Sequence, residues 1–299
     1  MTHRRHLARS GIAALLLVAA AVARADGAPH DLMLWRVEGA ANSVYLLGSI
    51  HLLRESDYPL PPVIDSAYDD AESLFMELDM DDLDPLAAQG IATELGVLSN
   101  GGSLEALLGS GPYRRAAELA ERADIPLALL GSTEPWLAAI NVEQLMLMRI
   151  GFDPAHGIET RFTRRAKTDS KAITGLESVR QQLEILDGLP MEVQRALLLQ
   201  TLEDSLELEA RMDELVRAWR TGDTGLLEQT MLRDMQEHPR LYEQLVVARN
   251  RNWTQRIVEL LKADEDVLVI VGALHLVGPD GLPALLEARG YRPAQMSQP

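Results

Sequence analysis

The chain has 299 residues, of which 47% are hydrophobic, and this apolar content is enough to form a sizeable core. Its formal net charge of −17 argues against nucleic acid and anionic membrane surfaces as main partners, because both repel an acidic protein. The sequence contains no cysteine, so disulfides, thiolate metal ligands and cysteine nucleophiles are excluded. Any metal site must therefore use histidine, aspartate and glutamate.

The first 25 residues have the pattern of a secretory signal peptide. Residues 1–10 are basic, residues 11–23 form an apolar run, and Ala23 and Ala25 place small residues before Asp26. The apolar run is shorter than the roughly 20 residues that span a bilayer. We therefore expect cleavage after Ala25, a periplasmic or secreted protein, and no stable membrane span after cleavage. An uncleaved anchor is the alternative.

Several short apolar segments predict strands. Residues 32–38 and 44–50 flank the turn-rich sequence GAANS and predict a β-hairpin. Residues 74–78 (LFMEL) and 171–177 (KAITGLE) predict two further strands. Residues 267–272 (VLVIVG) are β-branched and continuously apolar, which is typical of a strand in the interior of a sheet.

Helices are predicted for most of the chain between these strands. Apolar residues recur at helical spacing within 83–150, and a helix is predicted from residue 156 toward the strand at 171. A long amphipathic helix is predicted from Pro190 to about Arg220, followed by further helices to Ala263. The tail is expected to hold one short helix.

These elements favour an α/β fold with a central mixed β-sheet built from N- and C-terminal strands, flanked by helices and carrying a helical insertion. The predicted organisation is one domain over residues 26–299, with a helical subdomain at about 83–150 and 190–263.

Two nine-residue segments far apart in the chain share the pattern G-x-x-H. Residues 45–53 read YLLGSIHLL and residues 269–277 read VIVGALHLV, so both histidines follow a predicted buried strand. Ligand sites in open α/β sheets form at the carboxyl ends of strands, and a glycine there allows close approach. His51 and His275 could thus supply two nitrogen ligands for a divalent cation. For each histidine alone, a core side chain bonded to backbone is the alternative.

Carboxylates are expected to complete such a site. Glu77 closes the buried run LFMEL and is a candidate metal ligand or general base. Glu159 and Glu177 each follow a glycine and an aliphatic residue and are further candidates, with helix caps or exposed acids as the alternative. Arg249 could hold a substrate carboxylate or stabilise an oxyanion, or it could lie on a solvated helix face.

Motifs of other chemistries are missing from the sequence. There is no P-loop, G-x-G-x-x-G, G-x-S-x-G or H-E-x-x-H.

The order of several sequence blocks resembles the TraB/GumN family, which also includes the Tiki proteins, metal-dependent proteases of Wnt ligands. The blocks run collinearly over about residues 32–293, and they are residues 44–79, GIE at 157–159, residues 171–190, AWRTGDTGLLE at 218–228, ARNRNW at 248–253 and residues 267–291.

The resemblance implies an α/β core whose paired G-x-x-H motifs form the site with acidic residues. By motif, it implies His51, His275 and Glu77 as metal-site residues, and it places Arg249 and Asn250 on the family's RN pair. Glu159 and Glu177 fall in the GIE and GLE blocks. Metal-dependent peptidase activity, with Mn²⁺ or Co²⁺, is implied by the Tiki proteins alone. Membership of the family is by itself weak evidence of catalysis, because function depends on sites rather than folds.

We therefore expect an exported metal-dependent hydrolase of the peptidase type. His51 and His275 would bind a divalent cation with one or more of the three glutamates, the cation would activate a water, and Glu77 would shuttle the proton. Hard oxygen ligands make Mn²⁺ as good a candidate as Zn²⁺. The alternative is a non-catalytic cell-envelope protein that sequesters a peptide or small ligand. Hydrolysis of a non-peptide ester is a third reading.

Overall fold

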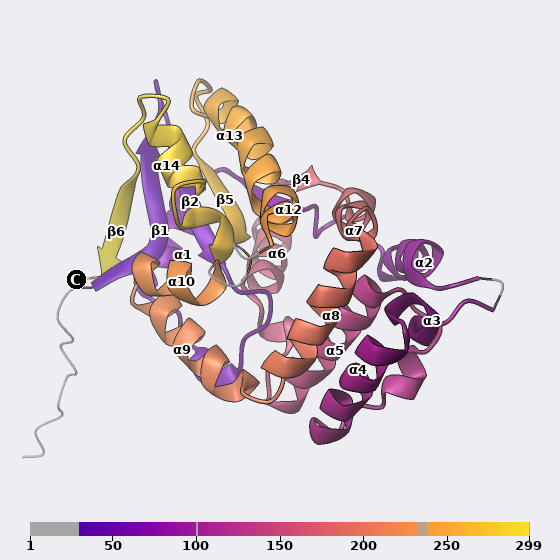
Figure 1. Ribbon diagram of the computed structural model, residues 1–299. Coiled ribbons are helices and arrows are strands. Elements are labelled where there is room, and N and C mark those ends of the chain that lie inside the picture. The colour runs from indigo at the N-terminus through magenta and orange to yellow at the C-terminus, as the bar shows by residue number, and fades with distance from the viewer. Residues whose placement is uncertain (1–29, 100, 233–234, 236–237, 299) are drawn as a thin grey trace, which may run out of the picture.

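The computed structural model describes residues 30–99, 101–232, 235 and 238–298 (Figure 1). The predicted signal peptide lies outside these residues. Six strands form one mixed sheet in the order β4-β3-β5-β2-β1-β6. The strands are β1 (His30–Glu38), β2 (Ser43–Ser49), β3 (Ser73–Leu78), β4 (Ile173–Glu177), β5 (Val267–Gly272) and β6 (Ala294–Gln298). The predicted fold class is thereby confirmed.

Four neighbouring strands of the sheet run in the same direction. β5 pairs in parallel with β2 on one side and with β3 on the other, and β3 pairs in parallel with β4. β1 and β6 complete the sheet as antiparallel strands. The carboxyl ends of β4, β3, β5 and β2 therefore meet at one edge, which is where polar residues can gather around a ligand.

The strand sequences explain this arrangement. Residues 267–271 of β5 are buried, as expected of a β-branched strand with neighbours on both sides. The predicted hairpin is present as β1 and β2, with Trp35 opposite Leu46. β6 was not predicted, because AQMSQ carries no β-branched or aromatic residue and pairs at the sheet edge through its backbone.

Helices and short helical turns connect the strands. The α-helices are α1 (Pro62–Asp70), α2 (Pro85–Gly96), α3 (Leu104–Leu108), α4 (Ser110–Arg122), α5 (Pro135–Arg149), α6 (Ile158–Asp169), α7 (Val179–Asp187), α8 (Met191–Asp204), α9 (Leu208–Arg220), α10 (Thr224–Met231), α12 (Pro239–Tyr242), α13 (Ala248–Leu260) and α14 (Leu282–Glu287). The short turns are η1 (Glu55–Asp57), η2 (Leu127–Leu130), η3 (Pro154–His156), the π-helical η4 (Glu243–Val247) and η5 (Ala273–Leu276).

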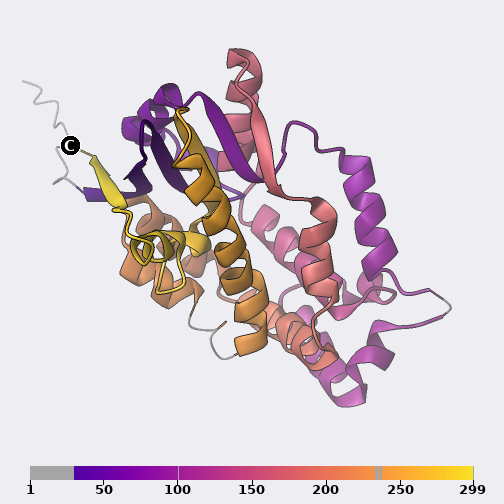
Figure 2. The ribbon, with the colours of Figure 1, turned by 90° about the horizontal axis from the view of Figure 1, so that it is seen from above.

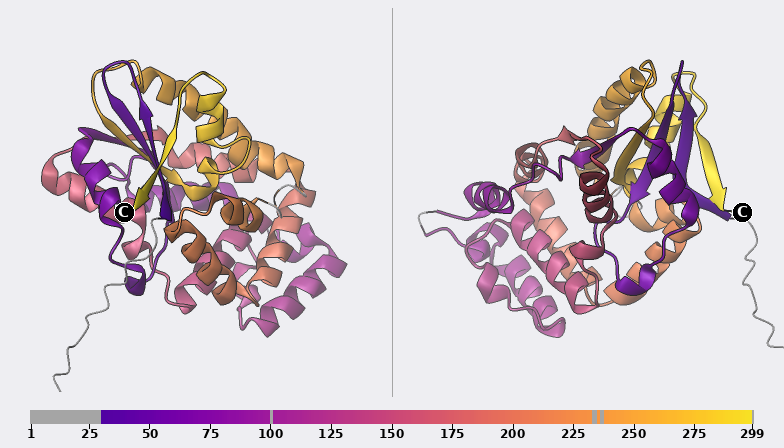
Figure 3. Two further views of the ribbon diagram at one scale, coloured as in Figure 1. Left: turned by 90° about the vertical axis from the view of Figure 1, so that its left-hand side faces the viewer. Right: turned by 180° about the vertical axis from the view of Figure 1, so that it is seen from behind.

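Buried apolar side chains of the described residues form two clusters. The larger one surrounds the sheet and includes side chains from α1, α6, α13 and α14. The smaller one joins α3, α4, α5 and α8, which pack together on the side of the molecule away from β6 (Figures 1 and 2). Figure 3 shows the same separation from two further sides. We call the smaller group of helices the helical lobe.

The predicted long helix from Pro190 to Arg220 is wrong. The chain forms two helices, α8 and α9, with a break at residues 205–207. Leu202 before the break belongs to the cluster of the helical lobe, whereas Leu208 after it packs against the cluster around the sheet. Packing against two different partners therefore turns the chain, although no glycine or proline marks the turn.

The part of the chain that the structure describes contains no helix with both the length and the apolar character needed to cross a bilayer.

Candidate functional site

Polar side chains gather at the carboxyl edge of the four parallel strands. They come from the ends of the strands and from the helices packed beside them. The set comprises Ser49 and His51 at and after β2, Glu77 in β3, Glu177 in β4, His275 in η5, Glu159 in α6, Gln182 in α7, and Arg249 and Asn250 in α13. All seven residues singled out in the sequence are in this set.

His275 is buried, and its neighbours fix its tautomer. Asn250 donates through Nδ2 to the carbonyl oxygens of His275 and Asp280, at 3.2 and 2.8 Å, so its Oδ1 faces the imidazole as an acceptor. The Nδ1 of His275 lies 2.7 Å from that oxygen and therefore carries the proton. The Nε2 lone pair faces Arg249 Nη1 at 3.1 Å.

Glu77 and Glu177 share the guanidinium of Arg249. Arg249 Nη2 donates to Glu77 Oε2 at 2.6 Å, and Arg249 Nε donates to the two oxygens of Glu177 at 3.1 and 3.0 Å. Gln182 Nε2 donates to Glu77 Oε2 at 3.0 Å, and the N–H of Gly272 donates to Oε1 at 2.7 Å. The three charged side chains are at most 12% exposed. Removing Arg249 would leave two buried carboxylates without their shared partner, at a cost of about 3–5 kcal/mol.

His51 lies in the turn after β2, and its side chain is 59% exposed. Its Nδ1 is 2.8 Å from Glu159 Oε1, and Ser49 Oγ donates to the same oxygen. Glu159 reaches this position because Gly157 lets α6 begin directly against the backbone of His51. A β-carbon at residue 157 would lie only 2.0 Å from the carbonyl oxygen of His51.

Gly272 is the point where the two halves of the site meet. A β-carbon on Gly272 would lie 3.2 Å from Glu77 Oε1, 3.7 Å from His275 Cδ2 and 3.8 Å from His51 Nε2. The structure thus brings both G-x-x-H histidines and one carboxylate to a single glycine. The glycine leaves room for these three groups where any side chain would crowd them.

The buried groups of the site have strongly shifted pKa values. Burial alone would raise the pKa of Glu77, but His275, Arg249 and the N–H of Gly272 lower it to about 2. Burial lowers the pKa of His275 to about 3, so its imidazole is neutral near pH 7. Since a neutral ring exerts little Coulomb force, Arg249, His51 and the backbone N–H are the groups that keep Glu77 charged near pH 7.

The exposed histidine has the opposite shift. The Glu159 carboxylate beside it raises the pKa of His51, because it stabilises the charged imidazolium. Burial opposes ionisation of Glu159, but His51 and the Ser49 hydroxyl lower the pKa of this carboxyl below its ordinary value. The two imidazoles therefore differ in charge near neutral pH, and a cation that binds His51 through Nε2 must displace the proton on that atom.

The donor atoms beside Gly272 fit a divalent cation in their chemistry. The Nε2 atoms of His51 and His275 and the Oε1 of Glu77 form a nitrogen–oxygen set, and each Nδ1 is held by an oxygen, as in metal-ligating histidines. Across the described ranges, however, no group of three or more histidine, aspartate or glutamate side chains has the spacing of a metal site. Arg249 also donates to the Nε2 atom that would bind the metal.

Two predicted ligands are engaged elsewhere in the structure. Both oxygens of Glu177 accept from Arg249, and Oε1 of Glu159 accepts from Ser49 and lies against His51. They hold other site residues in place. Sequence reasoning missed Ser49 and Gln182. Ser49 lies inside the first G-x-x-H motif and could have been found there, whereas no pattern distinguishes Gln182.

The fold and the site define a class of protein. It is an α/β protein in which two G-x-x-H histidines, buried glutamates and an Arg–Asn pair meet at the carboxyl edge of a parallel set of strands. The model of the TraB/PrgY/gumN family matches residues 33–295, and the chain belongs to this family, which confirms the resemblance seen in its motifs.

Similar proteins include YbaP, an uncharacterized protein of Escherichia coli (strain K12). It is 24% identical over 255 residues, which cover 81% of this chain and 87% of YbaP. An uncharacterized protein of Treponema pallidum (strain Nichols) is 23% identical over 269 residues, which cover 86% of this chain and 80% of that protein. No solved structure matches the chain significantly.

Proposed function

We propose that this protein is an exported hydrolase that uses a divalent cation and acts on peptides. The observation that carries the proposal is the placement of both imidazoles and Glu77 around Gly272, with each Nδ1 held by an oxygen. The signal-peptide pattern of residues 1–25 supports export. The resemblance to the Tiki proteins supports Mn²⁺ or Co²⁺ as the cation and a peptide as the substrate, with Zn²⁺ as a further candidate.

The residues of the site have separate tasks in this proposal. His51, His275 and Glu77 would hold the cation, which when bound lowers the pKa of a water and polarises a carbonyl group. Glu159 and Asn250 orient the two imidazoles through their Nδ1 atoms. Glu177 balances the charge of Arg249, and Arg249 holds Glu77 in place.

The acidity of Glu77 bears on the role that the sequence predicted for it. A carboxylate with a pKa of about 2 is a weak general base, because an efficient base has a pKa near the working pH. The same property favours a metal ligand, since a ligand must be deprotonated. We therefore assign Glu77 to the cation rather than to proton transfer.

One contact favours a second candidate function. Arg249 donates to both Glu77 Oε2 and His275 Nε2, so a cation would have to displace the bond to His275. A site in which that bond persists would hold a peptide or small ligand without turnover. The second candidate is therefore a sequestering protein that uses the same site.

Metal uptake and cleavage can be measured on the same samples. Purified protein should take up Mn²⁺ in about a one-to-one ratio and cut a mixed peptide library in the presence of Mn²⁺, Co²⁺ or Zn²⁺. The double variant His51→Ala/His275→Ala should lose both properties. His156→Ala is the control and should keep them, because that ring packs against Tyr58. Metal uptake without cleavage would support the sequestering protein, and unchanged uptake by the double variant would refute the metal site.

A further inference from the structure

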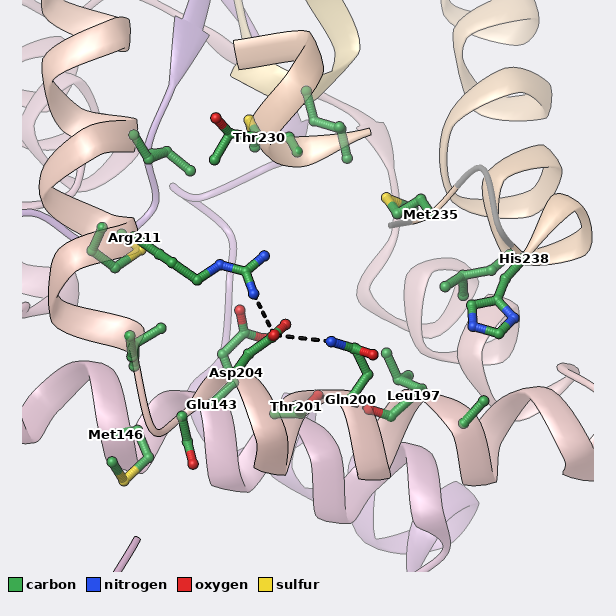
Figure 4. A pocket seen from close by; sticks show the side chains of 18 residues that line it. Glu143, Met146, Leu197, Gln200, Thr201, Asp204, Arg211, Thr230, Met235 and His238 are labelled. Carbon is green, nitrogen blue, oxygen red and sulfur yellow. Dashed lines mark hydrogen bonds and ion pairs between the residues drawn. The ribbon is translucent and has the colours of Figure 1, made fainter. Parts of the chain in front are cut away.

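A pocket of about 330 Å³ lies between the sheet region and the helical lobe (Figure 4). Its walls come from α5 and α8 on one side and from α9, α10 and η5 on the other. Met146 and Leu197 in its lining pack against the cluster of the helical lobe, whereas Met212 and Leu274 pack against the cluster around the sheet. The pocket therefore opens at the junction of the two hydrophobic clusters, a common position for ligand sites.

The lining of the pocket is suited to apolar groups. Met146, Met212, Met231 and Met235 contribute to it, and all four are only partly buried. Methionine side chains are flexible and polarizable, so they adapt to apolar groups of different shapes. We call this cavity the methionine pocket.

Two of the charged residues in the lining, Asp204 and Arg211, are paired with each other, and Glu143 adds one further carboxylate. Figure 4 shows Asp204 between Arg211 and Gln200. Arg211 Nη1 and Gln200 Nε2 both donate to Asp204 Oδ1, the latter at 2.9 Å. An ion pair that is already complete offers little attraction to a charged ligand, and the remaining carboxylate of Glu143 disfavours an acidic one. The apolar side chains therefore make the main contribution to binding an uncharged group.

The methionine pocket and the candidate site are linked through η5. Leu274 lines the pocket and directly precedes His275 in η5. A molecule held beside Gly272 can therefore extend a side chain along Leu274 into the pocket.

We propose that the methionine pocket binds a large apolar side chain of the substrate, next to the bond that is cut. This assignment rests on the proposed hydrolase function for its role in the reaction, but binding itself can be tested without turnover. A volume of about 330 Å³ is near the lower limit for ligand pockets and suits one aliphatic or aromatic side chain rather than a whole folded partner.

Methionine methyl NMR tests the pocket directly. Protein labelled at the methionine methyl groups is titrated with N-acetyl-L-leucine amide and with N-acetyl-glycine amide, and signals are assigned by single Met→Leu variants. The leucine compound should shift the four pocket methyls and bind at least about tenfold more tightly, the ratio expected for burying one large side chain. The methyls of Met33, in β1, and of the exposed Met148 should stay unchanged.

A pair of matched substitutions locates the binding. Ala196→Phe, from the α8 wall, should fill the pocket and weaken the leucine compound at least about tenfold. Ala263→Phe makes the same change at an exposed turn before β5 and should have no effect. If Ala196→Phe fails to fold, Thr230→Phe repeats the test from the α10 wall. Equal binding of both compounds, or shifts confined to methyls outside the pocket, would overturn the proposal.

Peptide cleavage separates this proposal from the proposed function. In the library digest, Ala196→Phe should reduce cleavage beside leucine, methionine and phenylalanine more than cleavage beside glycine or alanine. If no peptide is cut but the methyl shifts appear, the pocket stands and the hydrolase function falls. If the wild type and Ala196→Phe cut peptides with the same preferences, and the NMR signals of the pocket methyl groups do not move, the pocket proposal is refuted while the hydrolase function stands.

Discussion

His51 and His275 hold their Nδ1 atoms against different acceptors. His51 faces the carboxylate of Glu159, which stabilises an imidazolium, whereas His275 faces the neutral amide of Asn250. The ring of His51 is open to solvent, and that of His275 lies under Trp253, with ring centroids 4.5 Å apart. The two G-x-x-H motifs have the same spacing, but their histidines differ in charge and in exposure. His275 is the better neutral nitrogen ligand for a cation.

The buried histidine predicts how stability depends on acid. The pKa of His275 falls from an ordinary 6.5 to about 3 on folding, so the unfolded chain binds an extra proton between these values. Stability should therefore fall as the pH drops from 6.5 toward 3, with a contribution from this residue of up to about 1.4 kcal/mol per pH unit. Glu77, whose pKa is lowered to about 2, adds a loss of the same sign below about pH 4.5.

Urea unfolding in metal-free buffer between pH 6.5 and 4.5 measures this slope. His275→Gln should lower the stability at pH 7 but flatten its dependence on pH. Ser66→Ala, at an exposed position of α1, leaves both histidines and their partners and should keep the wild-type slope. An unchanged slope in His275→Gln would contradict the assignment of a neutral buried ring.

At the scale of elements, one glycine sets the approach of α6 to the turn after β2. Gly157 has no side chain to separate the start of α6 from the His51 carbonyl, and Glu159 in the first turn of α6 thereby reaches the imidazole. The backbone of Gly157 itself is one that alanine can adopt, with φ −59° and ψ 151°. The requirement for glycine at this position therefore comes from packing rather than from backbone conformation.

Replacement of Gly157 by alanine should separate these two elements. Because the new β-carbon would lie 2.0 Å from a backbone oxygen, α6 must shift, and we expect a loss of about 1–3 kcal/mol of unfolding free energy. Gly90→Ala in the exposed part of α2 is the matched control. Nothing lies within 4 Å of its added carbon, so it should stabilise by about 0.5–1 kcal/mol. Thermal unfolding of both variants checks the pair, and equal effects would contradict the packing argument.

The elements differ in how well the sequence predicts them. β5 and the hairpin follow from local patterns of β-branched and apolar residues, and the prediction for them was correct. The break between α8 and α9 depends on which cluster each apolar residue joins, and β6 depends on backbone pairing with β1. Neither cause is present in the local sequence.

The same distinction applies to the candidate site. Strand ends and glycines mark His51, Glu77 and His275, because those features can be read within a few residues. The bonds that engage Glu177 with Arg249 join residues 72 positions apart. Only the folded structure shows that the Glu177 carboxylate is already bonded to Arg249 and is not available as a metal ligand.

At the scale of the whole molecule, the helical lobe has its own buried cluster. Leu198 in α8 is fully buried in that cluster, together with side chains from α3, α4 and α5. Regions of a protein with separate cores can open separately, and their amide hydrogens then exchange at different rates. The lobe is thus expected to open without the sheet.

Leu198→Ala tests this separation. The cavity should destabilise the lobe by about 2–5 kcal/mol and raise amide exchange more than about tenfold in α3, α4, α5 and α8, while β2 and β5 remain slow. Leu86→Ala, at a side chain that is 83% exposed, should leave exchange unchanged. Hydrogen exchange read by mass spectrometry distinguishes the cases. A uniform rise over lobe and sheet would show that the molecule unfolds as one unit.

The central position of β5 determines when the sheet can become continuous. In the sheet, β5 is the strand that joins β2 to β3, so without residues 267–272 the β1–β2 pair and the β3–β4 pair have no shared strand. Both β2 and β3 then present an unpaired inner edge, which is prone to pairing with other chains. The first 266 residues therefore contain most of the mass of the chain but no continuous sheet, and the last tenth of the sequence supplies the strand that joins its two parts.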